Sequence, residues 1–323
     1  MKHNLVIAAI PDSRDFAAQV AALLGIEQAP IEFRTFADGN VWCKYQESIR
    51  ETYLYVIGST DGTPPCGSAF KFEQLKQLIS AGVLASAARV TAVMPYFEMR
   101  QDVKDEPRTD LTATRHAREI VNAGASRIIT MDLHADQAQG WFYPIPVDHL
   151  YASWSFINWL KKNDLNISGC TSPDVGGNKR SQKYARFLKT NFVFTFKNRP
   201  KQNESQVVGI AGDPGQGTLL MVDDAIDTGG TAVNASAAWH NSGAANIDAF
   251  IPHAILSTDP RKGEALYRIE QSNIRKLYVT DSIRLKRSSP KVEVITVAPL
   301  FAEAIKAHYG GGSISHLFLE NMK

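Results

Sequence analysis

Short apolar segments alternate with longer amphipathic segments along the whole chain. The apolar segments are rich in β-branched residues and have few polar positions, which predicts strands buried on both faces. They comprise residues 5–10, 53–58, 90–96, 127–133, 192–196, 218–224, 246–253 and 292–297. The segments with helical periodicity are long enough to connect parallel strands, and they comprise residues 13–24, 70–84, 113–122, 182–188 and 231–241. This order predicts an α/β fold with mainly parallel sheets.

The length of 323 residues favours two domains of about 150 residues each. Residues 122–135 and 241–254 match at six of fourteen aligned positions. A repeated unit and an ordinary junction between helix and strand explain this match equally well. Pro144 and Pro146 break the pattern and favour a boundary near residue 150. We therefore expect one domain over residues 1–150 joined by 300–323, and a second over 151–299.

Composition narrows the partners and the compartment. Apolar residues make up 44% of the chain, charged residues 21%, and the net charge is only +2, which argues against nucleic-acid or membrane partners. Cys43, Cys66 and Cys170 form no CxxC pair, so neither a disulfide framework nor a zinc site is indicated. The N-terminal apolar run is short for a signal peptide, and no run is long enough to cross a bilayer. We expect a cytoplasmic protein.

The sequence MVDDAIDTGGTA at 221–232 joins a buried strand to a helix through acidic residues and glycines. Glycines at the end of a parallel strand let backbone N–H groups point at a ligand, and the helix N-terminus adds positive potential, so the loop can hold a phosphate. Asp223 and Asp224 are suited to accept hydrogen bonds from two ribose hydroxyls. An ordinary turn that caps the helix is the alternative, which these two acids disfavour. The predicted sugar-phosphate site comprises Asp223, Asp224, Asp227, Thr228, Gly229, Gly230 and Thr231.

This loop resembles the phosphoribosyl-pyrophosphate loop shared by phosphoribosyltransferases and ribose-phosphate pyrophosphokinases. Further segments resemble successive pyrophosphokinase motifs in the same order, namely 95–108, 129–142, 146–152, 172–180 and 311–318. The resemblance covers nearly the whole chain. It implies two phosphoribosyltransferase-like domains that transfer the β,γ-diphosphoryl group of ATP to the C1 hydroxyl of ribose 5-phosphate.

Diphosphoryl transfer requires cations to converge on the developing negative charge. Lys197 and Arg199 follow a buried strand, and strand alternation points both to the same side. They match the family's catalytic loop, which implies that they stabilise the transition state; without the resemblance they would be expected to be solvated. The resemblance also implies that His134 and Asp174 bind Mg²⁺. Imidazole is not a typical Mg²⁺ ligand, so the role of His134 depends on the resemblance alone.

The donor nucleotide site is also implied by the resemblance. Residues 33–40 are similar to a loop that reaches into a neighbouring subunit, where Phe36 would stack on adenine and Asp38 would help to hold the nucleotide. This implies a homo-oligomer, from dimer to hexamer. Asn40 stands where a glutamate is usual, which leaves the preference among nucleotide donors open.

A second donor segment contains Arg100, Gln101 and Asp102. The resemblance implies that Arg100 pairs with the donor phosphates, for which a planar guanidinium is well suited, and that His134 also contacts the nucleotide. A surface salt-bridge cluster with Asp105 and Arg108 is the alternative.

Many family members bind phosphate or ADP between subunits as a regulator. The residues that match this site are Ser48, Arg50, Gln139, Ser313 and Ser315. However, Asp136 replaces a usual serine and His149 a usual asparagine, and a carboxylate that faces a bound phosphate would repel it. We therefore expect weak or absent activation by phosphate. Residues 59–70 also depart from the family form, and no function is assigned to them.

Two other functions are compatible with this fold. A catalytically silent associated subunit would be expected to lose residues such as Lys197 or Asp174, which are present here. A phosphoribosyltransferase, which consumes the activated sugar, would not need Phe36, Arg100 or Lys197. The residues therefore favour an active, Mg²⁺-dependent diphosphokinase.

Overall fold

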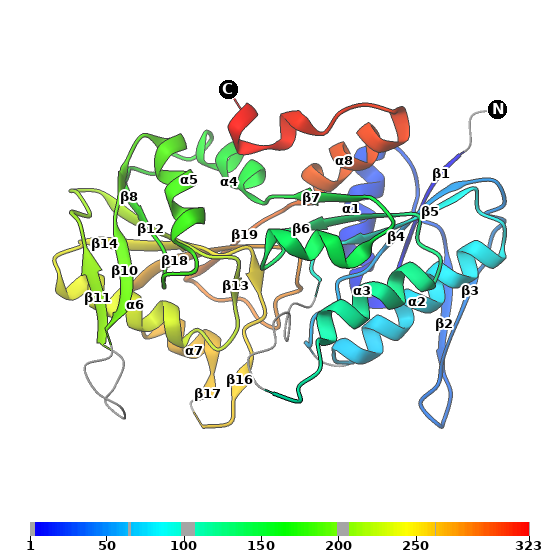
Figure 1. Cartoon of the computed structure of the whole chain (residues 1–323), viewed down its shortest axis with the longest axis horizontal. Helices are drawn as coiled ribbons and strands as arrows, with labels where there is room; N and C mark the ends of the chain where they lie inside the picture. Colours follow the sequence, from blue (N-terminus) through cyan, green and yellow to red (C-terminus); the bar gives the residue numbers. More distant parts are fainter. Residues whose placement is uncertain (1–3, 64–65, 98–106, 199–206, 262, 323) are drawn as a thin grey trace. The chain divides into compact units, whose positions relative to one another are not determined.

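The computed structural model describes residues 4–63, 66–97, 107–198, 207–261 and 263–322 (Figure 1). The chain divides into two compact units. The first comprises residues 1–154, 282–284 and 296–323, and the second comprises 155–281 and 285–295. A compact unit is not thereby shown to fold alone, so the domain limits expected above remain a prediction.

The first unit contains a five-stranded sheet in which every neighbouring pair is parallel. Its strands, in spatial order, are β1 (Leu5–Ala9), β4 (Tyr53–Ile57), β5 (Arg89–Met94), β6 (Arg127–Met131) and β7 (Val147–Leu150). An antiparallel pair, β2 (Ile31–Thr35) and β3 (Val41–Tyr45), lies outside this sheet. The strand order follows the chain order, so this sheet contains no reversal of direction.

Helices cover both faces of the first sheet. The helices are α1 (Arg14–Leu24), α2 (Ser68–Leu84), α3 (Thr112–Asn122) and α8 (Ala298–Gly310). On one face, Leu54 and Val56 of β4 pack in a core with Leu75 and Leu78 of α2 and with residues of α3. On the other face, α1 and α8 pack together (Figure 1). The sheet is therefore buried on both sides, as continuous apolar strands predict.

A buried charge cluster explains part of the segment 59–70. The Lys71 ammonium is almost fully buried, and it lies 2.9 Å from Asp61 Oδ1, 2.8 Å from Asp12 Oδ2 and 3.0 Å from Thr63 Oγ1. Asp61 Oδ1 also accepts the backbone N–H of Thr63 at 3.0 Å. The cluster therefore ties the segment after β4 to α2 and to the segment after β1.

The second unit contains a six-stranded sheet in which every neighbouring pair is parallel. Its strands, in spatial order, are β19 (Val292–Ile295), β18 (Ile274–Thr280), β14 (Asn246–Phe250), β12 (Thr218–Val222), β8 (Ile167–Thr171) and β9 (Asn191–Phe192). The chain goes from β8 to β9 on one side, and from β12 to β14, β18 and β19 on the other. The direction of strand addition thus reverses between β8 and β12.

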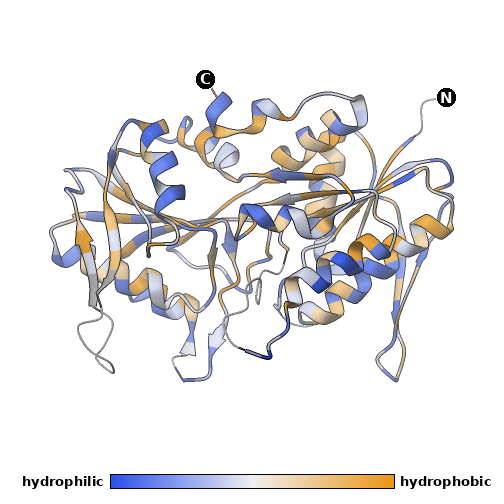
Figure 2. Ribbon diagram, in the orientation of Figure 1, coloured by the Kyte–Doolittle hydropathy of each residue, from blue (hydrophilic) through white to orange (hydrophobic). Residues whose placement is uncertain are grey.

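Helices also cover both faces of the second sheet. They are α4 (Ser153–Leu160), α5 (Asn178–Leu188), α6 (Gly230–Asn241) and α7 (Ala265–Glu270). Residues of α6 and α7, including Trp239 and Ile269, pack with Leu219 and Met221 of β12. On the opposite face, Phe156 of α4 stacks on Phe250 of β14 at a centroid distance of 4.1 Å. Figure 2 shows that the strands of both sheets are mostly hydrophobic, whereas helices such as α3 mix hydrophobic and hydrophilic residues.

The predicted single strand over 192–196 is wrong. Residues here belong to β9 and to β10 (Phe194–Asn198), which lie in different sheets. β10 pairs antiparallel with β11 (Val207–Ala211), while the backbone N–H of Val193 still bonds to Cys170 O of β8. The buried Val193 thus marks the point where the chain leaves one sheet for the other.

The remaining elements are short. They are β13 (Ala225–Ile226), β15 (His253–Ala254), β16 (Thr258–Asp259), β17 (Gly263–Glu264), η1 (Pro11–Ser13), η2 (Asp136–Phe142), η3 (Ser315–Leu317) and η4 (Leu319–Asn321). The expected fold class, α/β with mainly parallel sheets, is confirmed. Within the described part of the chain, no helix has the length and apolarity that crossing a membrane requires.

We expect Lys71→Met to destabilise the first unit strongly, because it leaves the carboxylate of Asp61 buried without its cation. Breaking one partner of a buried ion pair costs about 3–5 kcal/mol. The measurement is calorimetric thermal unfolding, with Lys306→Met as control, because Lys306 is 73% exposed. The double variant Lys71→Met/Asp61→Asn should recover part of the loss. Equal melting temperatures for Lys71→Met and wild type would contradict this account.

Candidate active site

The reversal between β8 and β12 places two predicted loops at one edge of the second sheet. The loop from Ser172 to Gly177 follows β8, and the loop from Asp223 to Gly229 follows β12. The strands are parallel neighbours, so both loops leave from their carboxyl ends. Open α/β sheets bind ligands outside the carboxyl ends of the strands where the strand order reverses. The topology therefore indicates a ligand site at these loops.

A guanidinium joins the two acids at the end of β12. Arg180 Nη1 of α5 lies 3.0 Å from Asp224 Oδ1 and 3.5 Å from Asp223 Oδ1. Burial raises the pKa of Asp223 well above its ordinary value, and the neighbouring Asp224 raises it further, whereas Arg180 opposes the shift. The site thus keeps two acids close together although their charges repel.

The start of α5 approaches these acids through a glycine. A Cβ atom on Gly177 would lie 2.1 Å from Ser172 Oγ and 3.4 Å from Asp223 Oδ1. Any larger residue would therefore separate the loop after β8 from the acid pair. Asp174 belongs to the same loop, and its Oδ1 accepts the backbone N–H of Gly176 at 2.9 Å.

The D-T-G-G-T loop has the geometry expected of a phosphate loop. Gly229 has a φ of 74°, in the left-handed region that favours glycine, and α6 begins at Gly230. The first N–H groups of a helix have no partner within the helix, so they can bind an anion. Asp227 and Thr228 are half-buried, and Thr231 is exposed. The predicted sugar-phosphate residues therefore lie in one continuous segment, from the end of β12 to the first turn of α6.

In the first unit, His134 follows β6 on a constrained turn. Asp132 has a φ of 42°, and its Oδ2 accepts the backbone N–H of Ala152 at 2.8 Å. The backbone N–H of Leu133 donates to His149 Nε2 at 2.9 Å. These bonds fix the backbone while His134 itself is exposed. It is therefore not the buried core histidine that is common at a strand end.

The β2–β3 hairpin presents Phe36 at its tip, where it is 52% exposed. Asn40 donates to both oxygens of Asp38, from its backbone N–H at 3.0 Å and from Nδ2 at 2.7 Å. These bonds lower the pKa of Asp38. Asn40 therefore binds the carboxylate that the glutamate usual at its position would repel.

The residues that match the regulatory site all belong to the first unit. Ser313 Oγ donates to Ser315 Oγ at 2.8 Å, so these two are together. Ser48 and Arg50 are exposed on either side of the buried Ile49. Among the described residues, no hydrogen bond joins Ser48 or Arg50 to the serine pair.

Asp136 makes contacts within the first unit instead. Its Oδ1 accepts the Tyr151 hydroxyl at 3.1 Å and lies 3.7 Å from His149 Nδ1. Gln139 Nε2 donates to the carbonyl of Asp136 at 2.9 Å. Since His149 Nε2 already accepts a hydrogen bond, its proton belongs on Nδ1, toward this carboxylate.

Several predicted residues cannot be placed. Arg100, Gln101, Asp102 and Arg199 lie outside the described residues. Lys197 lies in β10 opposite Val208, and its side chain is likewise outside the described part.

Two arginines with direct contacts to the site were missed from the sequence. Arg180 lies in the motif at 172–180 but was assigned no role, and Arg268 of α7 donates to the carbonyl of Thr228. Neither carries a local signal, because their partners are 44 and 40 residues away.

The fold and the phosphate loop define a phosphoribosyltransferase-like α/β protein, and comparisons with known proteins narrow the class. Residues 5–124 match the family model for the N-terminal domain of ribose phosphate pyrophosphokinase, and residues 169–319 match the phosphoribosyl synthetase-associated domain. The chain therefore belongs to the ribose-phosphate pyrophosphokinase family, and the predicted resemblance is confirmed.

Individual relatives support this assignment over nearly the full length. The chain is 42% identical to the ribose-phosphate pyrophosphokinase of Chlorobaculum tepidum, over 98% of this chain and 96% of the relative. It is 39% identical to that of Porphyromonas gingivalis, over 98% of each. Phosphoribosylpyrophosphate synthetase from Mycobacterium smegmatis has a similar structure, with a TM-score of 0.85 and 30% identity over 96% of this chain and 100% of that one.

We expect Asp223→Asn to stabilise the second unit near neutral pH. The raised pKa means that the folded chain binds this proton more tightly than the unfolded chain, so stability falls as pH rises from about 4 through the raised pKa. Removing the acid should raise the melting temperature by about 2–4 °C near pH 7.5, and the gain should vanish as pH falls to about 4. The measurement is thermal unfolding against pH, with the exposed Asp164→Asn as control. A gain that is the same at every pH would refute this reading.

Proposed function

We propose that this chain transfers the β,γ-diphosphoryl group of ATP to the C1 hydroxyl of ribose 5-phosphate, giving 5-phosphoribosyl 1-diphosphate and AMP. Membership of the family supports this reaction. The observation that carries it is the D-T-G-G-T loop at the strand reversal, next to an acid pair held by Arg180.

The sugar phosphate would bind across this loop. Its 5-phosphate would accept hydrogen bonds from the backbone N–H groups of Gly229, Gly230 and Thr231 at the start of α6. Its ring hydroxyls would donate to Asp223 and Asp224. Because Arg180 already neutralises part of their charge, this pair suits a neutral diol better than a second cation.

The donor site would combine Phe36, Asp38 and Asn40 of the hairpin with Arg100, Gln101, Asp102 and His134. The exposure of Phe36 fits a ring that stacks on adenine. On this proposal the hairpin serves a neighbouring subunit, so that the active form is a homo-oligomer.

Mg²⁺ would be held by His134 and Asp174 together with the substrate phosphates. The described residues contain no cluster of three or more His, Cys, Asp or Glu side chains that could enclose a metal ion. Mg²⁺ commonly takes one or two protein ligands and completes its shell with substrate phosphates and water. When bound, Mg²⁺ neutralises the phosphate oxygens of the donor.

Lys197 and Arg199 would stabilise the transition state. Lys197 lies in the β10–β11 ribbon, whose five pairs of opposed residues hold the backbone on either side of the predicted catalytic loop. Cations at this position would offset the negative charge that develops on the transferred group and on AMP.

A cytoplasmic location is part of the proposal. Cys43, Cys66 and Cys170 are all free thiols, which fits a reducing compartment.

The reaction is tested by AMP formation from ATP and Mg²⁺, with and without ribose 5-phosphate. We expect formation to require the sugar phosphate and to fall at least about 100-fold in Lys197→Ala, because a charge-stabilising cation is lost. Lys162→Ala, which removes an exposed lysine, is the matched control. Absent turnover, or turnover that does not require the sugar phosphate, in folded wild type would contradict the proposal and favour a silent subunit.

We also expect inorganic phosphate to activate the wild type weakly, because Asp136 would repel an anion among the residues matching the regulatory site. Asp136→Ser should increase the activation. The measurement is initial rate against phosphate concentration, with exposed Asp15→Ser as control. Strong activation of the wild type would show that the carboxylate does not exclude the anion.

A further inference from the structure

The phosphate loop is in direct contact with α7. Arg268 of α7 donates to the carbonyl of Thr228, and the buried Ile269 lies 3.6 Å from the position that a Cβ on Gly229 would occupy. The first contact is made to the loop backbone at Thr228, and the second places Ile269 beside Gly229. A displacement of α7 would therefore displace the N–H groups that are proposed to bind the sugar phosphate.

α7 cannot keep its position by its own helical stability. It has six residues, whereas isolated helices shorter than about 12–15 residues are marginal in water. Ala265, Leu266 and Ile269 anchor one side of it in the core of the second unit. Further contacts to α7 come from α6, from β17 and from residues 286–291, which follow β18.

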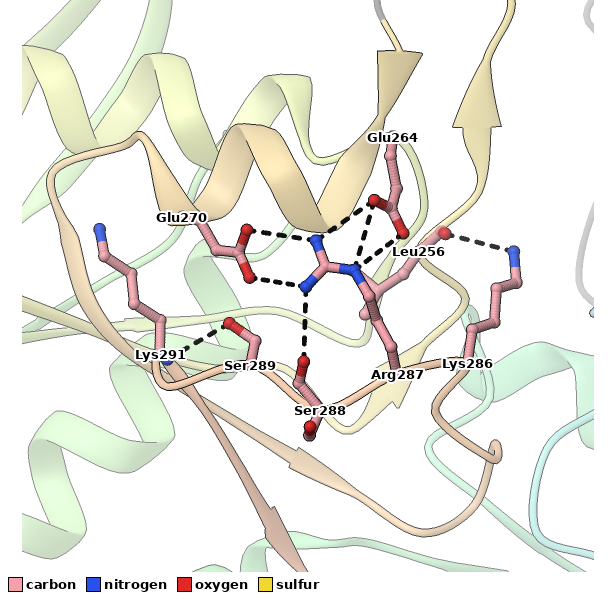
Figure 3. A network of polar contacts seen from close by, with 8 residues as sticks. All are labelled: Leu256, Glu264, Glu270, Lys286, Arg287, Ser288, Ser289 and Lys291. Carbon is pink, nitrogen blue, oxygen red and sulfur yellow. Dashed lines mark hydrogen bonds and ion pairs between the residues drawn. The ribbon is translucent and has the colours of Figure 1, made fainter.

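The guanidinium of Arg287 forms ion pairs at both ends of α7 (Figure 3). Arg287 Nη1 lies 2.8 Å from Glu270 Oε1 and Nη2 lies 3.2 Å from Glu270 Oε2, at the last residue of the helix. Arg287 Nε and Nη2 lie 3.2–3.4 Å from Glu264, the residue that precedes the helix. The two carboxylates raise the pKa of Arg287. The planar fork of arginine suits such a double bidentate contact, which an ammonium could not reproduce.

Two lysines extend the attachment. Lys291 Nζ donates to the carbonyl of Ser272, just beyond α7, at 2.7 Å and to that of Ile269 at 3.4 Å. The Ile269 carbonyl also accepts the backbone N–H of Ser272 at 3.1 Å. Lys286 Nζ donates to the carbonyl of Leu256 at 3.4 Å. The segment thus holds α7 and the strand connection before it.

We infer that Arg287 is a positioning residue for the sugar-phosphate site. It fixes α7 through Glu264 and Glu270, and α7 fixes the phosphate loop through Arg268. Arg287 is 39% exposed, so its ion pairs contribute little to overall stability. Their effect lies in geometry, since a small misplacement of binding groups costs far more in substrate recognition than in folding. This inference rests on the proposed function, because it takes ribose 5-phosphate as the ligand of the loop.

The test separates the two substrates. We expect Arg287→Met to raise KM for ribose 5-phosphate about five- to tenfold while KM for ATP stays within about twofold of wild type. The KM of Arg287→Lys for ribose 5-phosphate should lie between those of wild type and Arg287→Met, because lysine keeps the charge but lacks the planar guanidinium. Arg186→Met, which removes an exposed arginine of α5, should change neither constant. Equal changes in both KM values, or none, would overturn the inference.

A double-variant cycle tests whether the effect passes through α7. Arg268→Met should raise KM for ribose 5-phosphate more than Arg287→Met does. The double variant should be no worse than Arg268→Met, because both act on the same contact to Thr228. Additive effects would show that Arg287 acts elsewhere.

Calorimetric titration with ribose 5-phosphate in the presence of Mg²⁺ distinguishes this inference from the proposed function. Wild type that binds the sugar phosphate without turnover would refute the function, and the inference would then be judged by weaker binding to Arg287→Met. Unchanged binding to that variant would refute the inference alone. Absence of binding to the wild type would refute both.

Discussion

Two adjacent carboxylates at the end of a buried strand determine how the second unit is built. Asp223 and Asp224 repel each other, and the unit holds them together with the guanidinium of Arg180, 3.0 and 3.5 Å away. Arg180 can reach them only because β8 and β12 are neighbours and because Gly177 lets α5 begin against Asp223. Burial and the neighbouring Asp224 raise the pKa of Asp223, and acids perturbed in this way are common at functional sites.

Short elements around the site depend on charged residues for their position. The phosphate loop lies against α7, and α7 is held by Arg287 and Lys291 from a distant segment. In the first unit, the buried Lys71 holds the segment after β4 in the same way. In both units a charged side chain attaches a loop to a neighbouring helix, through the ion pair of Lys71 with Asp61 in the first unit and the hydrogen bond from Arg268 to the Thr228 carbonyl in the second.

The positions that depart from the family pattern have local explanations. Asn40 stands in place of the usual glutamate and donates two hydrogen bonds to the carboxylate of Asp38, which hold the tip of the hairpin in one conformation. Asp136 contacts Tyr151 and faces His149, so these two departures occur together. Each substitution therefore has a partner within the same unit.

The local pattern of the sequence determined the fold class, because strands buried on both faces read as continuous apolar runs. It also located the phosphate loop, since glycines, acids and a helix start are contiguous there. It did not predict β2, β3 or β18, whose charged residues interrupt the apolar pattern, nor the exchange of sheets at Val193. The tertiary structure alone decided the partners of Arg180, Arg268 and Arg287, because these contacts join residues 17 to 44 positions apart. Such contacts depend on strand order, which the local sequence pattern does not encode.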